Sequence, residues 1–294
     1  MSNSLENNVI KTWGDKGRAW LKALPSIVHA LTRYWNLSDL LPVKNLSYNY
    51  VMTGHQGITP IILKIACEQS EFKNEQSALT AYNGNSCIRL LDSNLEYNGL
   101  LLEQAIPGTS LVSFFPDRDN EALKLTVTIM QQLHAAQSPL GAHVPSIQDW
   151  FKDLFNPLHT SSSHHTHKAQ EIARHLFATQ PKSVLLHGDL HHGNILLSNH
   201  GWLAIDPKGI YGDPAFEICS FMQNPNPEVL QNKKLVLHRL ALFSEYLSID
   251  QERLQAWLYV TTVLDACWSM KEGQTDPKIA FAHAELVNAI LSKF

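Results

Sequence analysis

The segment Val184–Gly209, VLLHGDLHHGNILLSNHGWLAIDPKG, constrains this chain more than any other. It holds four histidines and two aspartates: His187, His191, His192, His200, Asp189 and Asp206. The histidines could bind zinc in a hydrolase, because neutral imidazole is a common zinc ligand. Alternatively, the aspartates and Asn194 could serve phosphoryl transfer, and most of the histidines would then be structural. The two interpretations predict different enzymes.

Residues 194–206 have the pattern of a strand, a turn and a second strand. With His200 at the centre of a three-residue loop and Gly201 at its positive-φ position, Asn194 lies opposite Asp206. Side chains opposed in this way have Cβ atoms about 4.5–5.5 Å apart. An amide oxygen beside a carboxylate suits Mg²⁺, which prefers oxygen ligands and leaves positions for substrate phosphates. A register shift of one residue would remove this pairing.

Asp189 precedes Asn194 by five residues, so the loop between them can bring its carboxylate beside the metal. There it could accept the proton of an attacking hydroxyl, a role for which protein kinases use the same spacing. A zinc site would instead require the loop to curl inward, so that His187, Asp189, His191 and His192 converge on one ion, with the imidazoles at about 2.0–2.1 Å from it. The residues favour phosphoryl transfer, and a zinc-dependent hydrolase is the alternative.

The N-terminal third alternates helices and strands. Helical periodicity over Arg18–Trp35, with a break or kink at Pro25, precedes strand patterns over Leu46–Ala66 and Cys87–Ile106. A helix is expected between the two strand regions, with Ser70 as its N-cap.

After Pro107 the patterns are mainly helical, beginning with an amphipathic helix over Asp119–Gln137. The His-rich stretch His159–Lys168 is expected to be a solvated loop. We therefore expect an α+β fold with a small antiparallel β-rich N-lobe, residues 1–103, and a larger α-helical C-lobe, residues 104–294.

Composition excludes several classes of protein. The 23 basic and 27 acidic residues give a net charge of −4, unlike the basic footprint of a nucleic-acid binder. No apolar run is long enough to span a membrane, and MSNSLENNVIKTW lacks the core of a signal peptide. The four scattered cysteines are expected to be buried free thiols. These features predict a cytoplasmic protein with no nucleic-acid or membrane partner.

Four sequence blocks carry a resemblance to a known family. HGDLHHGNIL resembles the HGDxHxxN motif of aminoglycoside phosphotransferase-like kinases, and AIDPKGIYGDPAFEI is similar to the branch of streptomycin 6-phosphotransferases and hydroxyurea-type resistance kinases. RAWLKALP and LLLEQAIPGTSL are similar to two further blocks of that branch. The resemblance implies a two-lobed protein-kinase-like fold, ATP and Mg²⁺ as cofactors, and phosphorylation of a hydroxyl group on an aminoglycoside or a related small compound. A metabolic kinase with an unrelated acceptor is the alternative within this fold.

By position, the resemblance makes Asp189 the catalytic base and His187 the brace of its loop. It makes Asn194 and Asp206 the Mg²⁺ ligands, and Lys64 the residue that contacts the α- and β-phosphates.

Lys64 is a lone charge in an apolar strand and needs an acidic partner on the next helix. Glu75 is expected to be that partner, and Glu71, one turn earlier, is the alternative. The chain has no GxGxxG motif, so Ser47 and Asn49 are expected to cover the phosphates with backbone amides and hydroxyls.

The hinge is expected at Glu103, Gln104 and Ala105, whose backbone would pair with the purine edge. Glu217 resembles the buried acid that supports the catalytic loop, and Asp213 is expected to fix the loop after Asp206.

A cationic acceptor would require an acidic cleft. Asp265 and Glu272 are the predicted acids of this cleft, with Asp276 beyond them and Trp268 as a wall. Exposed acids at the end of a helix are the alternative interpretation.

Overall fold

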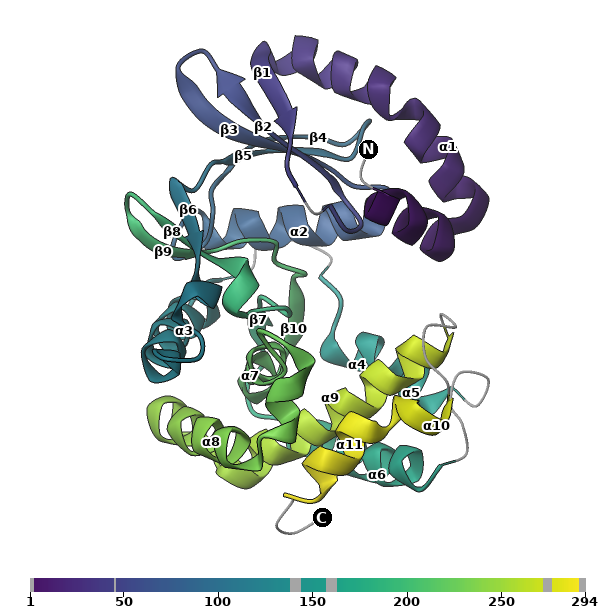
Figure 1. Cartoon of the computed structure of the whole chain (residues 1–294), viewed down its shortest axis with the longest axis vertical. Coiled ribbons are helices and arrows are strands. Elements are labelled where there is room, and N and C mark those ends of the chain that lie inside the picture. Colours follow the sequence, from purple (N-terminus) through teal and green to yellow (C-terminus); the bar gives the residue numbers. More distant parts are fainter. Residues whose placement is uncertain (1–2, 45, 138–143, 157–162, 272–276, 291–294) are drawn as a thin grey trace.

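The molecule consists of two lobes, one above the other in Figure 1. The structure is a computed structural model that describes residues 3–44, 46–137, 144–156, 163–271 and 277–290. The upper lobe contains an antiparallel sheet, and the lower lobe is largely helical. This is the α+β, two-lobed architecture that the sequence predicts.

The N-lobe sheet has five antiparallel strands in the order β1-β2-β3-β5-β4. Their bounds are β1 Leu37–Pro42, β2 Tyr50–Gln56, β3 Thr59–Ile65, β4 Leu90–Asn94 and β5 Gly99–Glu103. The hairpins β2–β3 and β4–β5 occupy the two regions in which strands are expected. They meet where β3 pairs with β5, so β3 lies in the middle of the sheet.

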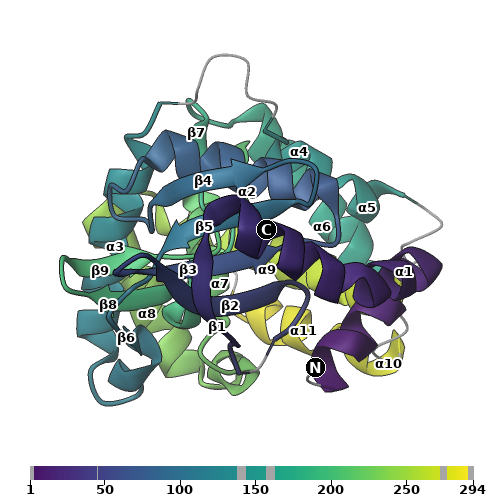
Figure 2. The ribbon, with the colours of Figure 1, turned by 90° about the horizontal axis from the view of Figure 1, so that it is seen from above.

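Two helices cover opposite faces of this sheet. α1 (Asn3–Trp35) packs on one face, in a core that includes Ile61 and Leu63 of β3. α2 (Gln69–Tyr82) packs on the other face, in a core shared with the C-lobe. Figures 1 and 2 show the sheet between the two helices. Because alternate residues of a strand point to opposite faces, Lys64 lies on the α2 side of the sheet.

The N-lobe differs from the expectations at three places. β1 was not expected. The break in α1 lies at Gly14, whose φ of 54° suits a residue without a side chain, whereas Pro25 lies inside the helix. Ser70 does not cap α2, because the helix begins one residue earlier and its N-cap residue is Glu68.

The C-lobe is built around a buried helix, α9. The C-lobe helices are α3 Asp119–His134, α4 Ile147–Trp150, α5 Lys152–Phe155, α6 His164–Ala178, α7 Ile218–Met222, α8 Lys233–Leu247, α9 Gln251–Lys271, α10 Pro277–Ala280 and α11 Ala282–Asn288. α9 is buried around its whole circumference, as expected for a helix enclosed by others. Its neighbours include α5, α6, α7, α8 and α11.

Short strands and 3₁₀ helices lie at the top of the C-lobe, beneath the N-lobe sheet. They are β6 Pro107–Ser110, η1 Leu111–Phe114, β7 Val184–Leu186, η2 His192–Asn194, β8 Ile195–Ser198, β9 Gly201–Ala204, β10 Ile210–Gly212 and η3 Pro214–Glu217. A further 3₁₀ helix, η4 Pro227–Gln231, contacts α8 and α11 instead. β6, β8 and β9 form one sheet, and β7 pairs with β10. The segment directly after the expected hinge is therefore a short strand, β6, paired with β8.

The hairpin β8–β9 forms, but the expected register is wrong by one residue. Ser198 pairs with Gly201 and Leu196 with Leu203, so the loop has two residues rather than three. The Ser198 hydroxyl closes this loop, accepting from the amide of His200 at 3.0 Å and donating to the carbonyl of Gly201 at 2.9 Å. Asn194 and Asp206 are consequently not opposed across the strands.

One further expectation concerns the C-lobe. Part of the stretch expected as a His-rich loop is helical, since α6 begins at His164; residues 157–162 lie outside the described residues. Ser163 explains this start, because its hydroxyl caps the helix by accepting from the amide of Thr166.

All four cysteines are buried and free, as expected. None of the described helices combines the length and apolar character needed to cross a bilayer.

Candidate active site

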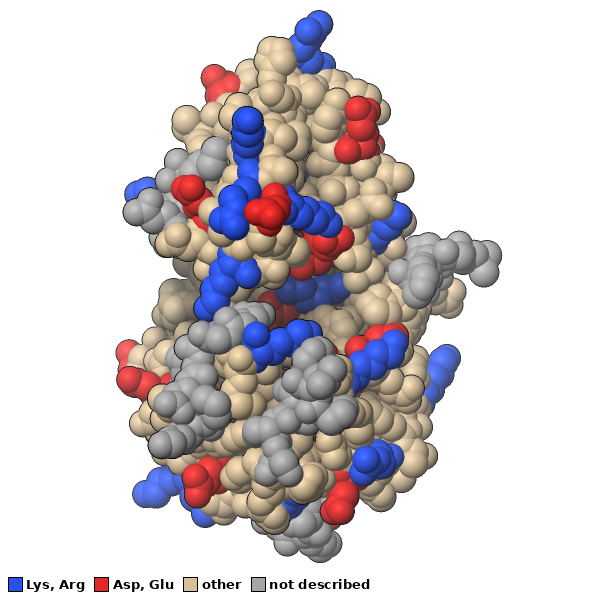
Figure 3. Space-filling view, turned by 90° about the vertical axis from the view of Figure 1, so that its right-hand side faces the viewer, with Lys and Arg blue, Asp and Glu red and all other residues tan. Residues whose placement is uncertain are grey.

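Three cavities meet between and below the lobes. The interlobe cavity, about 520 Å³, lies under the N-lobe sheet and includes all the residues expected to contact nucleotide: Ser47, Asn49, Lys64, Glu75, Glu103, Gln104 and Ala105. The loop cleft, about 680 Å³, lies between the loop that contains Ser47 and Asn49 and the loop that contains Asp189 and Asn194. The C-lobe cavity, about 500 Å³, lies between Asp189 and α9. Figure 3 shows a hollow at mid-height of the molecule, with acidic and basic side chains lying together in it.

The expected ion pair of Lys64 and Glu75 is present. The Lys64 ammonium lies 2.7 Å from the Glu75 carboxylate and 2.5 Å from that of Asp206, and both Lys64 and Glu75 are buried. Burial alone would lower the pKa of Lys64, but the two carboxylates outweigh it and raise the pKa. Glu71, the alternative partner, is exposed and borders the loop cleft. The Lys64–Asp206 contact joins the two lobes.

Asp189 and Asn194 face each other across the loop that they delimit. The Asn194 amide donates to the Asp189 carbonyl at 2.9 Å and approaches its carboxylate at 3.4 Å. Asn194, Asp189 and Asp206 all border the loop cleft. Asp206 reaches it because its backbone leaves the strand in the left-handed region, with φ 60°. A backbone turn, rather than cross-strand pairing, thus brings the predicted metal ligands to one cleft.

His187 lies at the centre of a buried brace beneath this loop. Its ring accepts from the Asp189 amide through Nδ1 and donates to the Ile205 carbonyl through Nε2 at 2.9 Å. Burial lowers the pKa of His187, so the ring is neutral, as this donor and acceptor pattern requires. Glu217 accepts from the amides of His187 and Gly188 at 2.7 and 2.8 Å. His134 lies 3.3 Å from the same carboxylate.

Asp213 holds the segment that follows. Its buried carboxylate accepts from the amide of Ala215, from the Trp257 indole at 2.6 Å and from the Arg253 guanidinium. These contacts fix the chain after Asp206 to α9, in keeping with the expected structural role.

The histidines of the opening segment do not converge on one point. His191 Nδ1 accepts from the amide of Gly193, whereas the His192 ring stacks on Phe221 at 4.0 Å, and both ring nitrogens of His187 are hydrogen-bonded as described above. Within the part of the chain that the structure describes, no three His, Cys, Asp or Glu side chains are grouped to hold a metal ion. The arrangement gives no support to the zinc interpretation.

The donor set at the loop cleft fits a hard cation instead. The Asn194 amide donates through its nitrogen, so its oxygen remains available as a ligand in the same cleft as the Asp206 carboxylate. Burial alone would raise the pKa of Asp206, but Lys64 and Lys208 hold it well below the usual range, so the carboxylate is ionised. One carboxylate and one amide oxygen suit Mg²⁺, which also retains positions for water and phosphate.

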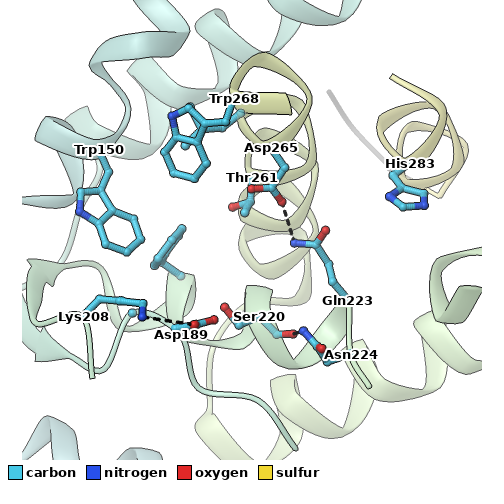
Figure 4. Close-up of a pocket in the computed structure, with 13 residues that line it drawn as sticks. Trp150, Asp189, Lys208, Ser220, Gln223, Asn224, Thr261, Asp265, Trp268 and His283 are labelled. Atoms are coloured by element: carbon cyan, nitrogen blue, oxygen red, sulfur yellow. Dashed lines mark hydrogen bonds and ion pairs between the residues drawn. The ribbon is translucent and has the colours of Figure 1, made fainter. Parts of the chain in front are cut away.

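Aromatic and polar side chains line the C-lobe cavity (Figure 4). Trp268 and Asp265 project from α9 and face Asp189 across the cavity, and the Trp150 ring lies 6.2 Å from that of Trp268. The Asp265 carboxylate accepts from the Gln223 amide at 3.0 Å. Burial raises the pKa of Asp265 to about 6. Glu272 and Asp276, the other predicted acids, lie outside the described residues.

Several residues that line these cavities were not anticipated. Lys208, in Asp-Pro-Lys-Gly, lies 3.5 Å from the Asp206 carboxylate and 3.9 Å from that of Asp189. Burial alone would lower the pKa of Lys208, but the neighbouring carboxylates raise it. Trp150 precedes the segment in sequence, and Trp13 of α1 packs edge-on against Tyr48 at the loop cleft. Of these residues, only Lys208 could have been identified from the sequence, because the lysine of Asp-Pro-Lys-Gly had been given no role.

Comparison with known proteins gives concordant matches. The family model described as "Aminoglycoside/hydroxyurea antibiotic resistance kinase" matches residues 35–273. A streptomycin 6-kinase from Streptomyces glaucescens is 25% identical over 90% of this chain and 88% of its own length. A streptomycin 3''-kinase from Klebsiella pneumoniae is 30% identical over 76% of this chain and 85% of its own length.

A solved structure matches the fold. A thermostable variant of aminoglycoside phosphotransferase APH(4)-Ia, in complex with ADP and hygromycin B, superposes with a TM-score of 0.69. It is 15% identical, and the match covers 90% of this chain and 99% of that one. The expected protein-kinase-like fold and the family resemblance are both confirmed. The chain is a phosphotransferase that belongs to the family of aminoglycoside and hydroxyurea antibiotic resistance kinases.

Proposed function

We propose that this phosphotransferase moves the γ-phosphoryl group of ATP, bound with Mg²⁺, to a hydroxyl group of a small cationic molecule such as an aminoglycoside. The observation that carries the proposal is the position of Asp189, which borders both the loop cleft and the C-lobe cavity. A carboxylate at this boundary can contact a hydroxyl on one side while the phosphate approaches from the other. Lobe boundaries at residues 103 and 104 fit the proposal, because the hinge would then form the back of the nucleotide site.

The interlobe cavity has the composition of a nucleotide site. Ile62, Leu102 and Leu196 offer apolar surface to a purine ring, and Glu103 to Ala105 offer backbone groups at its edge. Lys64, held by Glu75, would bind the α- and β-phosphates. Ser47 and Asn49 border both this cavity and the loop cleft, which suits a role in covering the phosphates.

The loop cleft would position the reacting groups. Asn194 and Asp206 would hold Mg²⁺, which offsets the charge of the β- and γ-phosphate oxygens. Asp189 would orient the acceptor hydroxyl and take its proton. His187 and Glu217 would keep this loop in place, since their hydrogen bonds end on its backbone amides. Catalysis would then depend on positioning and electrostatic stabilisation.

The C-lobe cavity would bind the acceptor. Trp150 and Trp268 provide flat apolar walls, and Asp265 provides a carboxylate on the side opposite Asp189. Aromatic faces beside a carboxylate favour a cation that also carries a hydroxyl group.

Substitution of the proposed base tests the mechanism. Asp189→Ala is expected to lower kcat by at least about 10²-fold, because general-base assistance and positioning are both lost. Binding of ADP with Mg²⁺ should stay within about twofold of the wild type, since the nucleotide cavity is intact. Asp206→Ala should abolish Mg²⁺-dependent turnover and also weaken Mg²⁺-nucleotide binding. Turnover that survives in Asp189→Ala would eliminate Asp189 as the base.

A screen of ATP consumption identifies the acceptor. The panel includes streptomycin, hygromycin B, hydroxyurea and small hydroxylated metabolites, both cationic and neutral, with the phosphorylated product identified by mass spectrometry. We expect turnover with a cationic member. Turnover only with a neutral metabolite would contradict the proposed acceptor class, and no nucleotide-dependent turnover with any member would contradict the proposed reaction.

A further inference from the structure

Lys208 occupies the junction of all three cavities. Its side chain borders the interlobe cavity, the loop cleft and the C-lobe cavity. Among the described residues, it is the only lysine or arginine that lines the loop cleft or the C-lobe cavity. The interlobe cavity has one other, Lys64, which is already engaged with Glu75 and Asp206. A phosphoryl group that passes from nucleotide to acceptor would therefore meet the Lys208 ammonium.

The backbone fixes the stem of this side chain. The Lys208 amide donates to the His187 carbonyl at 2.7 Å, which ties it to the loop that carries Asp189. Gly209 follows with φ 64°, and a Cβ there would lie 2.7 Å from the Asn74 carbonyl oxygen of α2. The close approach to α2 and the left-handed backbone both require glycine. The Asp-Pro-Lys-Gly motif thus sets the position of the lysine as well as that of Asp206.

The ammonium group lies between the proposed base and the proposed metal ligand. It is 3.9 Å from the Asp189 carboxylate and 3.5 Å from that of Asp206, outside the usual range of a strong hydrogen bond to either. The side chain is 40% exposed, and neither contact closes it off from the cavities. If Lys208 only neutralised the two carboxylates, a closer ion pair such as that of Lys64 would be expected.

We propose that Lys208 is a catalytic residue whose ammonium group binds the γ-phosphoryl oxygens while they move from nucleotide to acceptor. This inference rests on the proposed function. In the transfer, the bond from the γ-phosphorus to the β–γ bridging oxygen breaks and a bond to the acceptor oxygen forms. The hydroxyl proton goes to Asp189, and the electron pair leaves with ADP. Lys208 keeps its protons and stabilises the charge of the transferring group.

Nucleotide binding tests the inference without turnover. Lys208→Met removes the charge and keeps the length of the side chain. It should weaken binding of the non-hydrolysable analogue AMP-PNP by about 10-fold or more, the effect of losing one hydrogen bond to a charged group. Binding of ADP should stay within about twofold, because ADP has no γ-phosphate; retained ADP binding also shows that the variant is folded. Lys208→Arg should restore much of the AMP-PNP affinity.

The kinetic arm uses the wild type, the two variants and a matched control. Lys208→Met should lower kcat by about 10²–10³-fold, as when one preorganised donor to a transition state is removed. Lys152, which is 75% exposed and paired with Asp149, supplies the control Lys152→Met, for which kcat should be unchanged. Equal losses of ADP and AMP-PNP affinity, or a kcat within about threefold of the wild type, would overturn the assignment. Because the binding arm needs no acceptor, its outcome is independent of whether the acceptor screen succeeds.

Discussion

At the scale of single residues, Asp265 differs from the other acids of the site. Asp189 and Asp206 each have a lysine nearby, whereas Asp265 receives a hydrogen bond from a neutral amide, that of Gln223. Burial raises its pKa to about 6, which places its titration within the range of ordinary assays. A cationic ligand should favour the ionised form of such a carboxylate more than that of Asp189 or Asp206, because the ligand would supply the missing positive charge.

The affinity for a cationic acceptor should therefore depend on pH. A carboxyl group with a pKa of about 6 is ionised above that pH and neutral below it. We expect the KM for a cationic acceptor to rise about tenfold as the pH falls from about 7.5 to about 5, because the ionised fraction of Asp265 falls by this factor. Initial rates at varied acceptor concentration across this range measure the effect.

Asp265→Asn is the control. Its KM should be high and nearly constant over the same range, and a neutral acceptor should show no such dependence. An Asp265→Asn variant that keeps the wild-type pH profile of KM would show that another group titrates.

At the scale of elements, one buried ion pair ties α3 to α8. Arg239 is fully buried, and its guanidinium donates to both carboxylate oxygens of Asp119 at 2.9 and 2.6 Å. It also donates to the carbonyls of Phe221 and Asn224. His192, in the loop that carries Asp189, lies 3.7 Å from the same carboxylate. The pair therefore supports the C-lobe directly beneath the candidate site.

Removal of one partner should destabilise the protein strongly. Arg239→Met leaves the Asp119 charge buried without its counter-charge and should lower the free energy of unfolding by about 3–5 kcal/mol. Urea unfolding followed by circular dichroism measures it. Arg118→Met, in an exposed pair with Glu121, should cost no more than about 1 kcal/mol. The double variant Asp119→Asn/Arg239→Met should recover part of the loss; a loss equal to that of Arg118→Met would refute the role of the pair.

At the scale of the whole molecule, the two proposed substrate sites are separate spaces. The interlobe cavity is covered by the N-lobe sheet, and the C-lobe cavity opens between α9 and the loop that carries Asp189. Lys208 is the single described residue that lines both. In the proposed function, nucleotide and acceptor would therefore be bound together, and the phosphoryl group would not need to rest on the protein between them.

This arrangement predicts kinetics through a ternary complex. Double-reciprocal plots of initial rate against ATP, at several fixed acceptor concentrations, should intersect. Without acceptor, the enzyme should not exchange label between ADP and ATP, because no phosphorylated enzyme forms. Parallel lines together with such exchange would indicate a covalent phosphoenzyme instead.

Much of this protein is determined by local sequence. The alternation of apolar and β-branched residues predicts both N-lobe hairpins, and helical periodicity predicts most of the C-lobe, because side-chain burial follows the period of the element. The residues of HGDLHHGN and the later Asp206 are typical of the family's chemistry, so the candidate base and metal ligands could be proposed without a structure. Lys64 and Glu75 were paired correctly, because a charge in an apolar strand requires a nearby partner.

Only the tertiary structure decided how distant or strained parts of the chain lie relative to one another. The contact of Lys64 with Asp206 spans 142 residues, and no local pattern encodes it. The hairpin register depended on hydrogen bonds of the Ser198 hydroxyl that shorten the loop, and the left-handed backbone of Asp206 then directed its carboxylate to the cleft. The place of Lys208 at the meeting of three cavities follows from the same turn and from the packing of Gly209 on α2. Local sequence sets which elements form, whereas their long-range packing sets which side chains share a cavity.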